Sequence, residues 1–242
     1  MQLHPDILFS IFCFPVTNTI IATVLTDIVI IIMVIIVNRK ICFNPNNIQN
    51  IIEAIIDYFK EITETIAGEK SYFIYHWGVS FFLFIVISNL LVNLPGFDSI
   101  KFCNTISFKH TELSLLRVAT SDLNFTCALA VISIIATHFV SIQYIGIKEY
   151  FKKFITLKMF PIFLSVGFLE LMNEFSKVIS FSFRLFGNIF AGEKVISTIY
   201  NLYSLCLPVP FIILEIIVAI VQALVFSMLT ITFMHIMTEK LH

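Results

Sequence analysis

The sequence has little charge. Only 13% of its 242 residues are Asp, Glu, Lys or Arg, against roughly 25% in soluble domains. Glycine and proline are also scarce, at 7 each, which excludes collagen-like, linker-like and disordered chains. Hydrophobic residues make up 58% of the chain. Too few charged side chains remain to cover a soluble fold of this size, so the composition indicates a polytopic membrane protein.

Other missing features exclude several classes of function. The 5 cysteines are odd in number and contain no CxxC pair or metal-ligand spacing, which predicts core thiols and neither a disulfide framework nor a metal site. A net charge of -1 gives no footprint for nucleic acid. HExxH, GxGxxG and Walker-type loops are missing, so no enzyme motif and no cofactor are expected. No basic region precedes the first apolar run, and we predict no cleavable signal peptide.

Long apolar tracts predict an all-α membrane protein with five transmembrane crossings, because a spanning helix needs about 20 mainly apolar residues. The whole chain, 1–242, then forms one membrane domain. Most lysines and arginines between the tracts fall on one side, which predicts that the N-terminus lies outside and the C-terminus in the cytoplasm. The five predicted spans are residues 19–37, 73–94, 122–145, 160–205 and 208–237.

Residues 46–67 predict a different element, an amphipathic interfacial helix. Apolar residues recur at helical spacing from Ile48 to Ile66, and charged residues occupy the opposite face. Such a helix lies on the cytoplasmic membrane surface or against a partner helix. Because its polar face is acidic, with Glu53, Asp57, Glu61 and Glu64, attraction to anionic lipid is a poor explanation, and contact with a protein fits better.

The tract 160–205 is too long for an upright helix. As one helix it would extend about 69 Å, against a hydrocarbon core of about 30 Å. It must therefore break, near Gly167 or Gly187, or lie steeply tilted. No proline lies in its interior, which favours the tilted helix.

This tract also carries ionisable residues, each of which costs about 2.5–3.5 kcal/mol within a membrane and by default marks a pathway. One helical face holds residues spaced by three or four: Glu170, Glu174, Lys177, Phe181, Arg184 and Asn188. Glu174 and Lys177 are most simply a structural ion pair. Glu170 fits a solvated helix end or a pathway equally well. Arg184 has no acid three or four residues away, so its counter-charge must come from another helix or another chain.

The prolines at 208 and 210 predict a turn that folds the last two tracts into an antiparallel hairpin. Counted from that turn, Glu193 and Glu215 lie at similar depth near the outside, whereas Arg184 and Gln222 lie deeper. Polar residues return on the inner side. The pattern indicates two polar routes that meet at one fixed positive charge.

Two runs then resemble a known family. Ser180 to Glu193, SFSFRLFGNIFAGE, and Gln222 to Thr230, QALVFSMLT, resemble the signature segments of subunit a of F-type ATP synthases. The resemblance extends over roughly residues 89–242. It implies proton translocation without substrate chemistry in a non-catalytic subunit of an ATP-synthesising complex. The implied partners are a ring of c subunits, peripheral-stalk b subunits and the lipid bilayer.

The resemblance also assigns roles. Arg184 matches the essential charge that faces the c-ring carboxylate, where a fixed cation lowers the pKa of the approaching acid and favours proton release. The same charge blocks leakage between two aqueous half-channels. The proton pathway is implied to comprise Asn188, Gln222, Glu193 and Glu215 on the outer side, Asp122 and Asn124 at its mouth, and Glu170 and Ser180 near the inner exit.

One departure from the family concerns Glu193 and Glu215, because many relatives pair a Glu with a His at these places. Two neighbouring acids titrate as a pair, which predicts a shared proton. The same two carboxylates would also suit Na+ as the coupling ion.

Other interpretations have less support. An ion-coupled secondary transporter is the alternative function, although internal repeats and matching broken helices are missing. His138 is most simply a satisfied structural donor, and Asp27 and His76 have equally simple structural interpretations. The lack of a targeting segment favours the bacterial plasma membrane, while the inner membrane of an organelle fits an organelle-encoded chain.

Overall fold

A computed structural model describes residues 7–11, 14–39, 47–92, 101–103, 112–114, 117–147, 150, 162–202 and 207–239. Its long helices are α1 (Asn18–Arg39), α2 (Asn47–Ala67), α3 (Ser71–Val92), α4 (Leu123–Ile145), α6 (Ile162–Leu202) and α7 (Pro208–Thr238). Two short 3-10 helices, η1 (Gly68–Lys70) and η3 (Ala119–Ser121), precede α3 and α4.

Two short antiparallel hairpins add to the predicted helices. β1 (Ile7–Ile11) pairs with β2 (Phe14–Thr17), and β3 (Lys101–Cys103) pairs with β4 (Glu112–Ser114). The first hairpin is rich in β-branched and aromatic residues, which suit strands. Each strand is far shorter than a membrane span. The sequence analysis assigned no strands to these segments.

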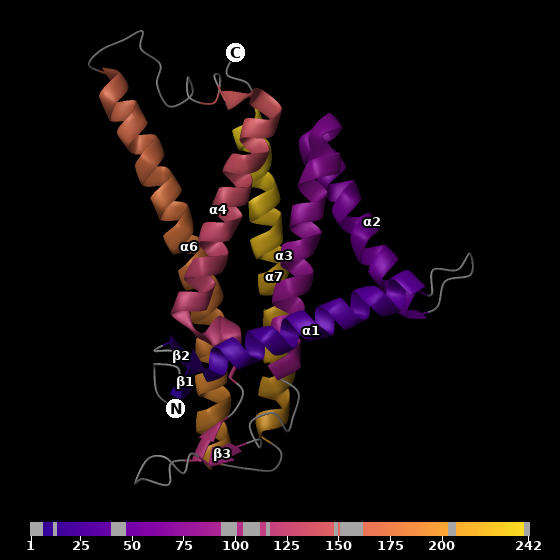
Figure 1. The fold of residues 1–242 in the computed structure, drawn as a ribbon, viewed down its shortest axis with the longest axis vertical. Helices are drawn as coiled ribbons and strands as arrows, with labels where there is room; N and C mark the ends of the chain where they lie inside the picture. The colour runs from indigo at the N-terminus through magenta and orange to yellow at the C-terminus, as the bar shows by residue number, and fades with distance from the viewer. Residues whose placement is uncertain are drawn as a thin grey trace.

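The bundle consists of α3, α4, α6 and α7, which run along the long axis of the molecule (Figure 1). α3 packs on α7, and α4 packs on both α6 and α7. Four described helices, α1, α3, α4 and α7, are long and apolar enough to cross a membrane. α6 is not among them. The structure is thus a mainly helical membrane protein.

The core combines large aromatic residues with small residues at helix crossings. Phe226 of α7 is 2% exposed and packs between Phe81 of α3 and Phe181 of α6, with ring centroids 5.7 and 5.0 Å away. Buried alanines, among them Ala130 and Ala223, occupy α4 and α7. Small residues let helix backbones approach closely where lipid gives no hydrophobic drive for association.

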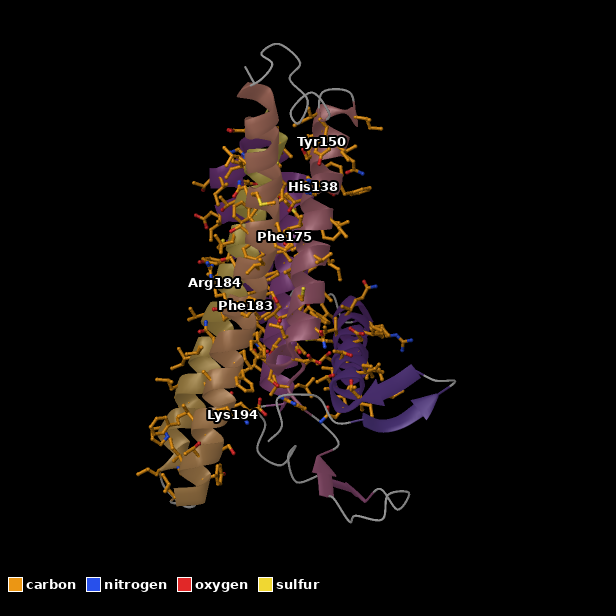
Figure 2. The ribbon with its side chains drawn as sticks, turned by 90° about the vertical axis from the view of Figure 1, so that its left-hand side faces the viewer. His138, Tyr150, Phe175, Phe183, Arg184 and Lys194 are labelled. Atoms are coloured by element: carbon orange, nitrogen blue, oxygen red, sulfur yellow. The ribbon has the colours of Figure 1, made fainter. Side chains whose placement is uncertain are left out.

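α1 differs from the other predicted spans in its direction. It runs across the bundle in Figure 1 and is seen nearly end-on in Figure 2. Only one end of it is buried, through Asn18, Thr19, Ala22 and Thr26. The rest presents exposed Ile and Val side chains. The segment predicted as 19–37 is helical over the expected length, but it is not aligned with the bundle.

α2 uses its apolar stripe within the chain. It rises beside α3 in Figure 1 and packs on α3 and α7. Phe59 is 1% exposed, and Ile55, Ile56 and Ile66 pack against the same core. The opposite face, with Glu53, Asp57, Glu61 and Glu64, is exposed. The structure thus shows the apolar stripe of α2 in contact with helices of the same chain, and the placement at the membrane surface stays a prediction.

The long tract, predicted to be either a broken helix or one tilted helix, forms the single helix α6. It runs unbroken through Gly167 and Gly187 for 41 residues, a length of about 60 Å. Its N-terminal part diverges from the rest of the bundle in Figure 1, while its C-terminal part lies beside α7. The long tract is therefore one helix, inclined to its neighbours.

Candidate functional site

The α6–α7 hairpin brings two predicted site residues into direct contact. The amide nitrogen of Asn188 donates to Oε1 of Gln222 at 2.8 Å. Gln222 is 5% exposed, whereas Asn188 is exposed. These residues are 34 positions apart in the sequence, so the contact fixes the register of the hairpin.

The acidic pair lies one to two turns nearer the hairpin turn. Glu215 is 6% exposed, and its carboxyl group lies against Gly192, where a built Cβ would be 3.4 Å from Cγ, Cδ and Oε1 of Glu215. The adjacent Glu193 interacts electrostatically with Glu215. The structure thus places the two predicted acids together, and Gly192 provides the space for the buried one.

Arg184 lies near the middle of the long hairpin (Figure 2) and is exposed. Its Nη2 donates to Oγ of Ser180, one turn earlier, at 3.3 Å. Among the residues that the structure describes, it has no carboxylate partner. The same helical face carries small or polar side chains, Ser180, Gly187, Asn188 and Ala191, and nothing lies within 4 Å of a Cβ built on Gly187. This face is open to a closely approaching partner.

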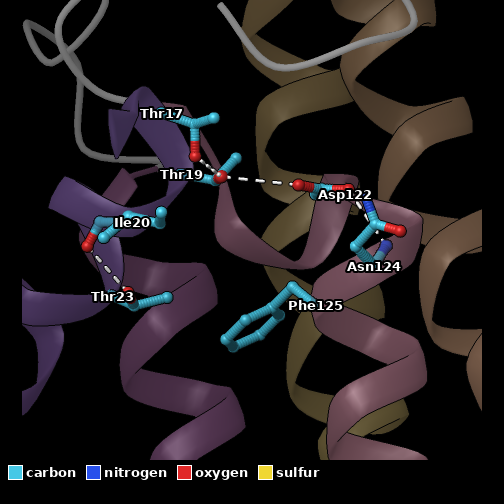
Figure 3. Close-up of a pocket in the computed structure, with 7 residues that line it drawn as sticks. All are labelled: Thr17, Thr19, Ile20, Thr23, Asp122, Asn124 and Phe125. Carbon is cyan, nitrogen blue, oxygen red and sulfur yellow. Dashed lines mark hydrogen bonds between the residues drawn. The ribbon is translucent and has the colours of Figure 1, made fainter. Parts of the chain in front are cut away.

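Asp122 and Asn124 lie at the start of α4 (Figure 3). The Asp122 carboxylate caps the helix by accepting a hydrogen bond from the backbone N–H of Asn124 at 3.0 Å. Its other oxygen accepts from Thr19 Oγ1 at 3.4 Å. With Thr17 and Phe125, these residues line a pocket of about 330 Å³ between α1 and α4. Both predicted residues therefore border a cavity, and Asp122 is also a structural cap.

A buried polar cluster next to this pocket went unnoticed in the sequence. Thr120 donates to Oδ1 of Asn89 at 2.5 Å, and Thr126 contacts Ser182 of α6 at 3.3 Å. Asn18 and Ser88 are fully buried, and their side-chain polar atoms have no hydrogen-bond partner among the described residues. Groups buried this deeply are normally hydrogen-bonded, often to internal water. Polar Ser88-Asn89 within an apolar tract was the available signal.

Apolar contacts connect this cluster to the hairpin. Val118, next to η3, packs with Ile189 of α6 and Ala219 of α7. Ile189 follows Asn188, and Ala219 lies between Glu215 and Gln222. The polar cluster therefore adjoins the hairpin at the levels of its amide pair and its acidic pair.

The other end of α6 contains the predicted ion pair and a group that the sequence analysis missed. Lys177 Nζ lies 2.8 Å from Oε1 of Glu174, which confirms that ion pair. Oε2 of Glu174 lies 3.8 Å from Nε2 of His138 on α4. The side chain of Glu170 lies outside the described residues.

The helices and the polar hairpin define a multi-pass membrane protein with ionisable groups along one long helix. Comparison with known proteins identifies the family: a model described as ATP synthase A chain matches residues 19–235. ATP synthase subunit a of Moorella thermoacetica (strain ATCC 39073 / JCM 9320) is 27% identical over 234 residues, which cover 96% of this chain and 95% of that protein.

The chain belongs to the family of subunit a of the F-type ATP synthases. It is therefore a proton-translocating component of a multi-subunit ATP synthase. Within the described residues we find no group of His, Cys, Asp and Glu that could hold a metal ion.

Proposed function

We propose that this chain is the stator subunit that guides protons to and from a ring of c subunits, through two half-channels separated by Arg184. The observation that carries the proposal is the setting of Arg184. It is a permanent cation on an exposed helix face, without an acidic partner among the described residues. A carboxylate on an approaching subunit would supply the missing counter-charge.

The neighbouring side chains support this partner. Gly187 and Ala191 lie one and two turns from Arg184 on the same face, and small residues of this kind allow close helix packing in membranes. An acid brought near the guanidinium would have its pKa lowered and would release its proton. The same positive charge would repel protons and prevent direct passage between the two routes.

The outer half-channel is assigned to the polar residues between the α1–α4 pocket and the hairpin. Protons would enter beside Asp122 and Asn124 and pass the buried cluster around Asn89. They would reach the acidic pair, Glu193 and Glu215, and then the hydrogen-bonded amides Asn188 and Gln222. Val118, packed on both hairpin helices, supports the continuity of this arrangement.

The inner half-channel is assigned to the α6 face on the other side of Arg184. Ser180 already accepts a hydrogen bond from Arg184, and Glu170 lies ten residues earlier on α6, about 15 Å along the axis. We place the C-terminus on this side in the cytoplasm and the N-terminus outside. The membrane is assigned as the bacterial plasma membrane.

Partner subunits would cover the exposed apolar surfaces. We assign the exposed Ile and Val side chains of α1 to contact with peripheral-stalk b subunits and lipid. Ile31, Ile32 and Val34 are each at least 50% exposed, more than a helix inside a closed core would be.

Replacing Arg184 by Ala tests the proposal. We expect ATP-driven proton pumping to be lost in membrane vesicles that contain the whole complex, while the chain still assembles. Arg39→Ala is the matched control, because Arg39 is an exposed cation at the end of α1. Pumping that survives the loss of Arg184 would refute the proposed mechanism.

A further inference from the structure

We propose that His138 is a proton-binding site at the inner end of the route, with Glu174 as its counter-charge. The inference rests on the proposed function and adds to it a residue that captures protons from the inner water. Figure 2 places His138 and Tyr150 together, farther along the bundle than Arg184 and on the side away from Lys194. Glu174 precedes Arg184 by ten residues on α6, about 15 Å.

Both nitrogens of the His138 ring face polar groups. Nδ1 lies 2.9 Å from the hydroxyl of Tyr150, and Nε2 lies 3.8 Å from Oε2 of Glu174. The other oxygen of Glu174 is held by Lys177 at 2.8 Å. Lys177 in turn lies over the ring of Phe233 on α7, 4.6 Å from its centroid. Among the described residues, Glu174, Lys177 and Tyr150 are the titratable groups that face His138 or its counter-charge.

This arrangement accommodates both protonation states of the imidazole. In the neutral ring, Nε2–H points to Glu174 and Nδ1 accepts from the Tyr150 hydroxyl. When a proton binds at Nδ1, that nitrogen becomes a donor, and the hydroxyl has only to rotate to accept from it. Burial and the negative charge of Glu174 raise the pKa of Tyr150, so its phenol stays protonated in both states. Only one N–H bond forms, and the same bond breaks on release.

The position of the cluster suits proton capture. The His138 side chain is 25% exposed and that of Glu174 is 14% exposed, so the pair joins the surface to the interior. Nε2 of His138 and Oε2 of Glu174 are farther apart than a direct hydrogen bond allows. A proton would therefore pass between the two side chains when they approach more closely, or through a bridging water. Imidazole is the side chain that ordinarily changes charge between about pH 5 and 8. An imidazole can therefore bind a proton in near-neutral water, where the concentration of free protons is low.

A pH profile separates proton capture from a structural clamp between α4 and α6. ATP-driven proton pumping would be measured in vesicles that contain the whole synthase. At each pH on the inner side, the pumping of the variant is divided by that of the wild type. For His138→Gln we expect a ratio close to one near about pH 6 and a loss of roughly threefold or more near about pH 8. His76→Gln is the control, because His76 is exposed and its ring contacts Tyr72 and Tyr75 of its own helix, away from the α4–α6 contact.

A ratio for His138→Gln that is the same at every pH would overturn the proposal, since a lost clamp weakens pumping uniformly. Glu174→Gln should give the same pH-dependent loss, and the double variant should be no worse than the more severe single one. If His138→Gln does not assemble, Tyr150→Phe is the second variant, because it keeps the imidazole and removes only its hydroxyl partner. Its pumping ratio to wild type must still change with pH, and a ratio that is the same at every pH would again overturn the proposal. Loss of pumping in Arg184→Ala together with a parallel His138→Gln profile would reject this site alone.

Discussion

Gly78 marks a close contact between α3 and α7, and enlarging this residue should displace α7. A Cβ built on Gly78 of α3 would lie 2.5 Å from Cδ1 and 2.8 Å from Cγ1 of Ile231 on α7, and 3.5 Å from Cδ1 of Phe59 on α2. Carbon atoms normally pack at about 3.5–4.0 Å. Ile231 is fully buried, so its side chain cannot move into solvent. An added methyl group must shift Ile231, and with it the helix that carries Gln222 and Glu215.

The cost of this shift can be bounded. Overpacking a core by one methyl group costs about 1–3 kcal/mol, and the helix preference of Ala over Gly returns roughly 0.5–1 kcal/mol. Gly78→Ala should therefore be mildly destabilising, and Gly78→Leu, with three more carbon atoms, severely so. The more decisive quantity is the coupling free energy between Gly78 and Ile231, which should be about 1–3 kcal/mol in favour of the double variant.

The assay is the thermal dissociation midpoint of the purified complex for a graded series. Ile231→Val removes only the atom at 2.5 Å and should relieve part of the Gly78→Ala cost. Ile231→Ala removes both close atoms and should relieve all of it, although it creates a cavity of its own. If the effects of Gly78→Ala and Ile231→Ala simply add, the two residues do not collide and the packing argument fails.

Two further variants test the hairpin. Gly187→Leu should leave the chain assembled in the membrane, because nothing lies within 4 Å of the Cβ position of Gly187. The larger side chain should strongly reduce proton pumping, because it would keep the ring of c subunits away from Arg184. Normal pumping would contradict the proposal that this helix face contacts the ring. Glu215→Gln should change how Glu193 titrates, followed by carboxyl infrared absorption against pH, because the two acids interact. Glu193 titrating identically in both proteins would exclude a shared proton.

Local sequence patterns predicted most of the helices. The segments predicted as 73–94 and 122–145 correspond to α3 at Ser71–Val92 and α4 at Leu123–Ile145. Apolar length is a local property, and Asp122 is a residue type that often caps a helix, so both are visible in a linear sequence. The two β hairpins were missed because strand pairing joins segments whose own patterns are too short to indicate it.

The hairpin contacts were predictable for a similar reason. Once the prolines at 208 and 210 fix a turn, counting outward in both directions places Glu193 beside Glu215, and the structure brings them together. The contact of Glu174 with Lys177 needed only helical spacing. His138 and Glu174 lie on different helices with no close turn between them, so counting could not bring them together. His138 was therefore interpreted as a lone structural donor.

The direction of α1 was the least predictable feature, and the physical reason lies in its composition. Its apolar residues surround the helix on all sides, so no stripe selects a face or an angle. Only its first half carries small residues at helical spacing, Thr19, Ala22 and Thr26, and these are the residues buried against the bundle. Thr19 also donates to Asp122, so this half of α1 forms a wall of the pocket at the proposed outer mouth. The opposite half is left with exposed Ile and Val side chains. Hence the contacts of the first half hold that end of α1 against the bundle, and the uniformly apolar second half offers no stripe that would select an angle.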